Sequence, residues 1–193
     1  MKKIILASNS PRRKELLKNL GICFSIIPAD IDESFLPEEH PRDAVRRLAR
    51  LKAEAAIPVL LEDCIVIAAD TIVVLDGQVL GKPVDADDAF NKLSQLSGCW
   101  HEVITAFCVR SIEGGCDVED EITRVCFRPL SKGEIYAYIA TGEPADKAGG
   151  YGLQGLGSLL VEKIEGSYFN VVGLPMSRLY SVLKKHGINL LGV

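Results

Sequence analysis

The 193-residue sequence lacks several patterns that define common functional classes. It contains no G-x-x-x-x-G-K-[ST] stretch, which argues against a P-loop nucleotide hydrolase. Only three histidines occur, His40, His101 and His186, and none pairs with another at metal-ligand spacing, which argues against a histidine zinc centre. If a metal takes part, we therefore expect a hard, oxygen-bound ion such as Mg²⁺ or Mn²⁺.

Long apolar runs and a net positive charge are missing as well. No run approaches the length of a membrane span, and the apolar residues after the first lysines are too few for a signal-peptide core, so we expect a cytoplasmic protein without a membrane partner. The net charge of -4 does not suit a protein that coats nucleic acid. Any basic patch should be local and fit a small anion in a pocket.

The six cysteines form no C-x-x-C pair, and several lie in apolar runs. Buried, reduced thiols are therefore expected rather than a disulfide framework. Hydrophobic residues make up 48% of the chain and charged residues 25%, which is typical of a folded domain and argues against disorder. A chain of this length is expected to form one domain spanning residues 1–193.

Strand and helix patterns interleave along the chain, which predicts an α/β fold with a mixed sheet. Asp76-Gly77 is typical of a two-residue hairpin and predicts some antiparallel pairing. We expect the sheet and its flanking helices to form two lobes around a cleft. Helices are predicted at residues 11–20, 41–57, 85–98, 131–142 and 175–186, and Ser131 and Glu134 stand at capping-box spacing at the start of the fourth. Strands are predicted at residues 3–8, 23–28, 64–75, 78–83, 101–112, 122–130 and 158–164, with a polar loop at 113–121.

The stretch "SNSPRRKELL" opens the first predicted helix with a capping serine, Ser10, and a proline. The first turn of a helix gathers unpaired N–H groups and partial positive charge, which makes an anion site. Arg12 and Arg13 add forked donors suited to phosphate oxygens, and Ser8 and Ser10 add hydroxyl groups. The alternative is a solvated basic turn in which Ser10 only caps the helix.

Asp70 interrupts the apolar run "VIAADTIVV", where an unpaired carboxylate would cost several kcal/mol. A metal ion, a nucleophilic water or a nearby Lys or Arg would compensate it, and each would place Asp70 at a site. The alternative is an aspartate at a strand end that backbone N–H groups satisfy. Glu33, in an acidic loop, is a candidate second hard ligand or simply a solvated carboxylate.

Lys52 and Lys82 are surface lysines by default, although Lys82 follows the hairpin that starts beside Asp70 and is therefore a candidate phosphate contact. The segment "DKAGGYGLQGLG" contains Lys147 and Gln154. Its glycines allow close approach of a ligand, and Gln154 supplies a donor and an acceptor in one amide. The alternative is a flexible loop in which the glycines serve only turns.

Taken together, the segments "LASNSPRRKELL", "IDES", "AADTIVVLDGQVLGKP", "LSGCWHEVIT", "RPLSKGEIYAYIATGEPADKAGGYGLQG" and "EGSYFNVVGLP" resemble the Maf family of nucleoside triphosphate pyrophosphatases. Several motifs in a fixed order make the resemblance specific, and it covers nearly the whole chain. It implies the elongated α/β fold of the inosine triphosphate pyrophosphatases and a homodimer.

The resemblance implies hydrolysis of a nucleoside triphosphate between its α and β phosphates with a divalent cation. Asp70 would accept the proton of the attacking water, and Glu33 and Asp70 would help to bind the metal. The residues expected to contact the substrate are Ser8, Ser10, Arg12, Arg13, Lys52, Thr71, Lys82, Lys147 and Gln154. Of these, Arg12, Thr71 and Gln154 match positions linked to substrate choice.

The loop "DKAGGYGLQG" resembles the branch of the family that acts on dTTP and UTP, rather than the branch that acts on 7-methyl-GTP. We therefore expect a dTTP and UTP pyrophosphatase, with modified pyrimidine triphosphates as further substrates. The alternatives are a nucleotide-binding regulator of septum formation with weak hydrolysis and a 7-methyl-GTP pyrophosphatase.

Overall fold

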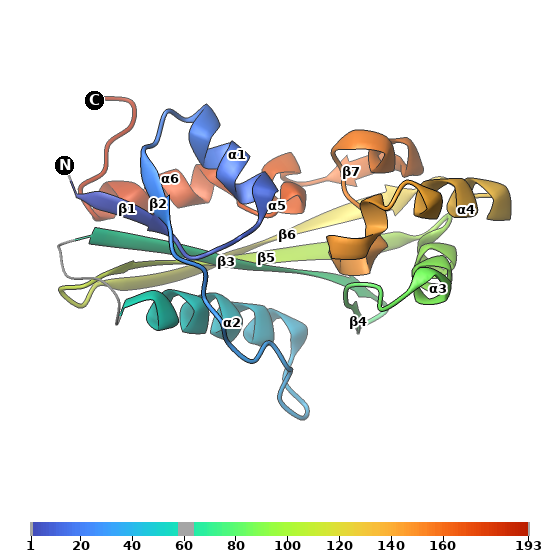
Figure 1. Cartoon of the computed structure of the whole chain (residues 1–193), viewed down its shortest axis with the longest axis horizontal. Helices are drawn as coiled ribbons and strands as arrows, with labels where there is room; N and C mark the ends of the chain where they lie inside the picture. Colours follow the sequence, from blue (N-terminus) through green and yellow to red (C-terminus); the bar gives the residue numbers. More distant parts are fainter. Residues whose placement is uncertain (1, 58–63, 193) are drawn as a thin grey trace. The chain divides into compact units, whose positions relative to one another are not determined.

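The computed structural model describes residues 2–57 and 64–192, and its strands form one mixed sheet (Figure 1). The strand order is β2-β1-β3-β5-β6-β7, and β4 pairs with β3. The strands are β1 (Lys3–Leu6), β2 (Phe24–Ile26), β3 (Cys64–Leu75), β4 (Gln78–Leu80), β5 (Trp100–Ser111), β6 (Cys116–Phe127) and β7 (Val161–Glu165). Parallel pairing joins β1 to β2 and β3, whereas β3–β4 and β6–β7 are antiparallel. The predicted α/β class with a mixed sheet is confirmed.

Helices interleave with these strands. The α-helices are α1 (Pro11–Asn19), α2 (Pro41–Ala56), α3 (Ala86–Leu96), α4 (Lys132–Ala140), α5 (Tyr168–Val172) and α6 (Met176–Lys185). Short 3₁₀ helices follow α4: η2 (Glu143–Asp146), η3 (Ala148–Gly150) and η4 (Gly155–Leu160). Within the described ranges, no helix is both long and apolar enough to cross a membrane.

The chain divides into two compact units that share the long strands β3, β5 and β6. The first unit comprises Met1–Asp70, Thr105–Glu121 and Gly173–Val193, and the second comprises Thr71–Ile104 and Ile122–Val172. In the first unit, α1 and α6 lie on one side of the strands and α2 on the other (Figure 1). Its core is built from fully buried aliphatic side chains of these elements, including Leu6, Leu17, Leu48, Ile65, Ile67, Leu179 and Leu183.

Local signals at the ends of α1 explain its bounds. The Ser10 side chain accepts a hydrogen bond from the Arg13 N–H, and Pro11 occupies the first turn, where no backbone donor is needed. At the other end Gly21 has φ of 70°, a left-handed conformation that favours glycine. Its N–H donates to the Lys18 carbonyl, and the Ile22 N–H donates to the Leu17 carbonyl, which is the Schellman pattern.

The second unit contains the predicted hairpin and its own core. Asp76 and Gly77 have φ of 49° and 80°, the pair of positive values that a type I′ turn requires, and β4 then returns along β3. The predicted capping box of α4 is present, because Ser131 and Glu134 exchange side-chain and backbone hydrogen bonds. The core cluster contains buried side chains of β3, β4, β5, β6, α3 and α4, together with Tyr151 and Leu160.

Several predicted boundaries are wrong. The strands expected to end at residues 28, 83 and 130 end at Ile26, Leu80 and Phe127. The polar loop expected at 113–121 is shorter, because β6 begins at Cys116. The strand expected at 158–164 begins at Val161, since residues 155–160 form η4. The segment before the last helix, expected to be a loop, contains α5 (Tyr168–Val172).

Ion pairs to α2 explain why an acidic segment lies inside β6. Asp120 is buried, and its carboxylate accepts hydrogen bonds from Arg46 and, at 2.8 Å, from the Nε of Arg42. Burial of this charge is tolerable because both arginines compensate it.

The cysteines are also less buried than expected. Cys64 and Cys108 are buried, but Cys23, Cys99 and Cys116 are exposed and Cys126 is half-buried. Burial was therefore predicted wrongly for the three exposed thiols.

Candidate active site

Asp70 lies within β3 with its side chain only 12% exposed, and the Lys52 ammonium is 2.6 Å from its Oδ1. Lys52 belongs to α2 and is itself buried, with a side chain 10% exposed. A buried carboxylate needs a counter-charge, and Lys52 supplies it. Of the compensating groups expected from the sequence, a nearby lysine is confirmed, and the default interpretation of Lys52 as a surface lysine is wrong.

Glu33 approaches the same ammonium from the segment between β2 and α2. Its Oε1 is 2.7 Å from the Lys52 Nζ, although the Glu33 side chain is 50% exposed. One buried cation therefore joins two carboxylates, of Asp70 and Glu33, that are 37 positions apart in the sequence. This arrangement gives a compact group of two acids and one base.

Arg47 holds the segment that carries Glu33 against α2. Its Nη2 donates to the Ser34 carbonyl at 3.1 Å, and its guanidinium makes a two-point contact, each 2.7 Å long, with the Glu39 carboxylate. These hydrogen bonds from Arg47 lower the pKa of Glu39. Asp32 also accepts from the Ser34 N–H at 2.9 Å, so both backbone polar groups of the residue after Glu33 are hydrogen-bonded.

Arg13 is buried in the first turn of α1 and is oriented by two acceptors. Its Nε donates to the Gly173 carbonyl at 2.8 Å, and its Nη1 donates to the Ser8 Oγ at 3.2 Å. Burial lowers the pKa of Arg13, and the negative charges of Asp70 and Glu33 oppose this shift. The guanidinium is therefore within the electrostatic reach of the two carboxylates.

The first unit thus brings together five residues expected at the site: Ser8, Arg13, Glu33, Lys52 and Asp70. Ser10 and Arg12 are half-buried at the start of α1. The Ser10 N–H donates to the Ser8 Oγ at 3.2 Å, so Ser8 is held by hydrogen bonds from both Ser10 and Arg13. Ser10 caps the helix, as one reading of the sequence expected.

The other expected site residues belong to the second unit. Thr71 follows Asp70 on β3, and alternation along a strand directs the two side chains to opposite faces. Lys82 is exposed just after β4, and its neighbour Gly81 accepts a hydrogen bond of 3.2 Å from the Gly149 N–H. Gln154 is half-buried in the glycine-rich segment that follows.

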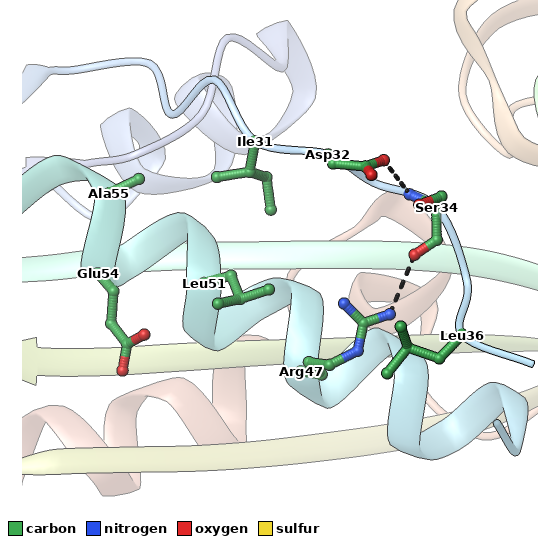
Figure 2. A pocket seen from close by; sticks show the side chains of 8 residues that line it. All are labelled: Ile31, Asp32, Ser34, Leu36, Arg47, Leu51, Glu54 and Ala55. Carbon is green, nitrogen blue, oxygen red and sulfur yellow. Dashed lines mark hydrogen bonds between the residues drawn. The ribbon is translucent and has the colours of Figure 1, made fainter.

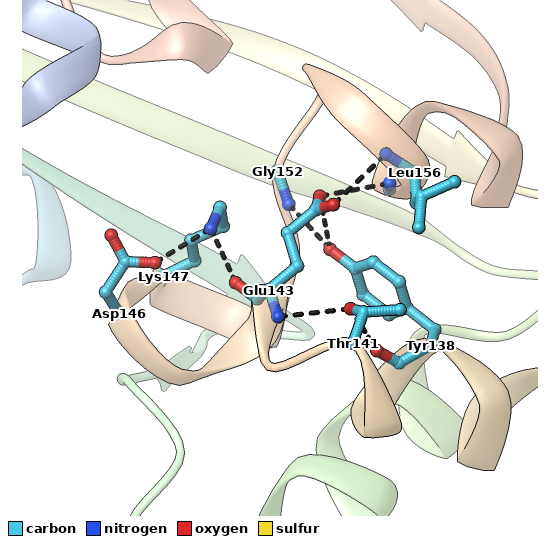
Figure 3. Close-up of polar contacts among 8 residues, drawn as sticks. Tyr138, Thr141, Glu143, Asp146, Lys147, Gly152 and Leu156 are labelled. Carbon is cyan, nitrogen blue, oxygen red and sulfur yellow. Dashed lines mark hydrogen bonds and ion pairs between the residues drawn. The ribbon is translucent and has the colours of Figure 1, made fainter.

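Lys147 makes local contacts in the same segment. Its ammonium donates to the Glu143 carbonyl and lies 2.7 Å from the Asp146 carboxylate (Figure 3). Its side chain is 13% exposed. Lys147 is therefore engaged with its own segment, and its expected contact with substrate stays a prediction.

A cavity of about 600 Å³ lies beside the segment that carries Glu33 (Figure 2). Its lining is largely apolar and comes from that segment and α2: Ile31, Asp32, Ser34, Leu36, Arg47, Leu51, Glu54 and Ala55. None of the residues expected at the site lines it. The charged cluster around Lys52, rather than this cavity, is therefore the candidate active site.

The cluster has the donor set of a weak hard-ion site. Among residues 2–57 and 64–192, no group of three or more His, Cys, Asp or Glu side chains is arranged to hold a metal. Glu33 and Asp70 together offer two carboxylates. Mg²⁺ is commonly bound by one or two carboxylates together with substrate phosphates and water, so these two residues fit that mode and not a protein-only cage.

Two features of the site were not predicted from the sequence. The Gly173 carbonyl, which orients Arg13, gives no sequence signal because any residue carries a carbonyl. The burial of Lys52 does have one, since Val45, Leu48, Lys52 and Ala56 recur at helical spacing and all lie on the buried face of α2.

Solved structures define the class of fold. The Staphylococcus aureus Ham1 protein matches with a TM-score of 0.58 and 16% identity, over 96% of this chain and 100% of that chain. A HAM1 protein from Coxiella burnetii matches with a TM-score of 0.53 and 15% identity, over the same shares. Identities this low establish the shared fold alone. The chain itself belongs to the Maf-like protein family, whose sequence profile matches residues 3–186.

Curated relatives support the family assignment over the full length. A dTTP/UTP pyrophosphatase of Syntrophomonas wolfei is 57% identical over 187 residues, which cover 96% of this chain and 98% of the relative. A dTTP/UTP pyrophosphatase of Alkaliphilus metalliredigens is 51% identical over 193 residues, covering 99% and 100%. The family resemblance expected from the motifs is confirmed.

Proposed function

We propose that this protein hydrolyses dTTP and UTP to the monophosphate and pyrophosphate, as one catalytic domain. The observation that carries the proposal is the buried Lys52 ammonium in contact with Asp70 and Glu33, beside Arg13. A carboxylate for proton transfer then lies next to cationic groups for phosphate, which is the pairing that a pyrophosphatase needs. Names of relatives at 57% and 51% identity support the same substrates.

Asp70 is the proton acceptor in the proposed reaction. A water oxygen attacks the α-phosphorus while its proton passes to the Asp70 carboxylate. The bond between the α-phosphorus and the α–β bridging oxygen breaks, and that oxygen leaves with pyrophosphate. Lys52 compensates the Asp70 charge before substrate binds, and its proposed role afterwards is to contact the incoming phosphates.

Arg13 and Ser8 are the proposed anion contacts of the first unit. The start of α1 gathers backbone N–H groups, and the Arg13 fork is fixed by Gly173 and Ser8 before any phosphate arrives. Such pre-ordering lowers the entropy lost on binding. Ser10 and Arg12 on the same turn are further proposed contacts, and the contacts of Lys82 and Lys147 with substrate stay predictions.

A divalent cation, Mg²⁺ or Mn²⁺, fits this proposal. Glu33 and Asp70 would hold it, and when bound it would neutralise phosphate charge and stabilise the leaving pyrophosphate. In the protein alone, the Lys52 ammonium contacts both of these carboxylates and balances part of their negative charge. Excess chelator should abolish turnover and added Mg²⁺ should restore it, whereas full activity in chelator would remove the metal from the proposal.

Gln154 is the proposed reader of the base, with Arg12 and Thr71 as further determinants of substrate choice. Uracil and thymine present an N–H between two carbonyl oxygens. The Gln154 amide can accept a hydrogen bond from that N–H and donate one to a neighbouring carbonyl oxygen. A paired contact of this kind is worth about 1 to 3 kcal/mol by analogy with bidentate base readout. Gln154→Ala should therefore lower kcat/KM for dTTP and UTP about ten- to hundredfold and leave GTP hydrolysis much less changed.

The decisive experiment uses a panel of dTTP, UTP, CTP, GTP, ATP and 7-methyl-GTP with Mg²⁺ in ¹⁸O-labelled water. The proposal predicts pyrophosphate release, preference for dTTP and UTP, and one ¹⁸O in the monophosphate. Label in the pyrophosphate would locate attack at the β-phosphorus and contradict the proposed step. Tight nucleotide binding without turnover would instead favour a regulator, and preference for 7-methyl-GTP would favour the other branch of the family.

The expected homodimer and cytoplasmic location stay predictions. Sedimentation of the purified protein at two or more concentrations measures the first, and cell fractionation measures the second.

A further inference from the structure

Glu143, in the second unit, lies against the glycine-rich segment that carries Gln154 (Figure 3). Its Oε2 accepts a hydrogen bond of 3.1 Å from the Leu156 N–H. Its Oε1 accepts from the Gly157 N–H, also at 3.1 Å, and from the Tyr138 hydroxyl at 3.0 Å. One carboxylate thus accepts three hydrogen bonds, two of which come from backbone just after Gln154.

Tyr138 connects Glu143 to Gly152, which precedes Gln154 in the sequence. Its hydroxyl accepts a hydrogen bond of 3.3 Å from the Gly152 N–H while it donates to Glu143. Tyr138 projects from α4 and is only 5% exposed, so its ring is fixed by the core of the second unit. Residues 152 and 156–157 are therefore tied to one rigid support, with Gln154 between them.

The glycines of the segment fit closely around this support. A Cβ atom at Gly157 would lie 2.1 Å from the Gly152 carbonyl oxygen and 2.7 Å from the Tyr138 hydroxyl. At Gly155, where φ is 69°, a Cβ atom would lie 3.0 Å from the Glu143 Oε2. The glycines therefore allow the backbone to pack onto Tyr138 and Glu143, rather than serving only to make the loop flexible.

Charge and chemistry make Glu143 hard to replace. An ionised carboxylate has only acceptors, and the two N–H groups and one hydroxyl that contact Glu143 all donate to it. Hydrogen bonds to an ionised acceptor are roughly twice as strong as neutral ones. A glutamine at this position would turn its NH₂ group toward one of the donors and lose that contact.

We infer that Glu143 is a positioning residue for base recognition, because it holds the segment that presents Gln154. The inference rests on the proposed function, since it deepens the role given there to Gln154. Glu143 does not touch the reacting atoms in this view; it acts through the backbone of residues 152–157.

The test compares Glu143→Gln with Glu134→Gln. Glu134 is a matched control because it also belongs to the second unit and its carboxylate also accepts from a backbone N–H and a hydroxyl, both of Ser131 at the start of α4, although it accepts in addition from Arg128. Glu143→Gln should lower the preference for UTP over GTP about tenfold, because kcat/KM for UTP falls while that for GTP changes little. Glu134→Gln should leave the preference unchanged. Tyr138→Phe, which removes only the hydroxyl, should lower the preference in the same direction.

A double-mutant cycle separates positioning from general stability. If Glu143 acts through Gln154, Glu143→Gln should have little further effect on the preference in a Gln154→Ala background. Equal effects in both backgrounds would overturn the inference.

Hydrogen exchange of the nucleotide-free protein gives a readout that does not depend on activity. At least one of the amides of Leu156 and Gly157 should exchange about tenfold faster in Glu143→Gln, and both should exchange at the wild-type rate in Glu134→Gln. Unchanged exchange in Glu143→Gln would show that the carboxylate does not hold the segment. A wild-type protein that cleaves neither dTTP nor UTP would overturn the proposed function and the part of the inference that concerns base choice, while the exchange result would still decide whether Glu143 holds the loop.

Discussion

Replacing Lys52 with methionine should destabilise the protein strongly, because it leaves the buried Asp70 carboxylate without its ammonium. The Lys52 and Asp70 side chains are 10% and 12% exposed, so solvent screens this pair weakly. Removal of one partner of a buried pair typically costs 3 to 5 kcal/mol, and we take about 3 kcal/mol because Glu33, the other partner, is half exposed. With a urea m-value of about 2 kcal/mol per molar, the unfolding midpoint should fall by about 1.5 M.

Equilibrium unfolding in urea, followed by far-ultraviolet circular dichroism, measures this shift. Lys185→Met is the matched control, since Lys185 lies 3.5 Å from Asp117 with a side chain 60% exposed, and it should move the midpoint by less than about 0.5 M. Lys52→Met/Asp70→Asn should recover much of the lost stability, because the unpaired charge is gone. A Lys52→Met midpoint within about 0.25 M of the wild type would refute the reasoning that this ammonium compensates a buried charge.

Two further predictions concern single side chains. Burial lowers the pKa of His101 to about 4 from 6.5, so the folded protein binds its proton less readily than the unfolded chain. Stability should fall by up to about 3 kcal/mol as the pH drops from 6.5 to 4, and His101→Gln should flatten this part of the urea-midpoint profile; an unchanged profile would contradict the assignment. Arg13→Lys keeps the positive charge, but a lysine cannot contact Ser8 and Gly173 at the same time as the guanidinium does. KM for UTP, measured by steady-state kinetics, should therefore rise at least about tenfold. An unchanged KM would remove Arg13 from the phosphate site.

Much of the fold follows from local signals in the sequence. The Asp76-Gly77 turn, the start of α1 after Ser10 and the capping box of Ser131 were predicted because each depends on residues a few positions apart. The start of β6 was not predictable in the same way. Its acidic residues are typical of a loop, and the arginines that compensate Asp120 lie on α2, more than 70 positions away in the sequence.

The candidate site shows the same division. Asp70 stands out in the sequence because a carboxylate interrupts an apolar run, and its need for compensation was predicted. The identity of the compensating group was left open, since only the fold brings Lys52 and Glu33 to it. Glu143 gave no signal of its own, because a glutamate near a turn is typical of a solvated surface and its partners are backbone N–H groups.

Turnover of dTTP by Asp70→Asn tests the central claim most directly. Asp120→Asn is the matched control, because Asp120 is also a buried, ion-paired aspartate of the first unit but lies outside the site. With Mg²⁺ present and pyrophosphate release as the readout, Asp70→Asn should lower kcat by at least about a thousandfold while dTTP affinity changes only a few-fold, and the folded Asp120→Asn protein should keep its activity. An Asp70→Asn kcat within a few-fold of the wild-type value would contradict the role of Asp70 as the proton acceptor.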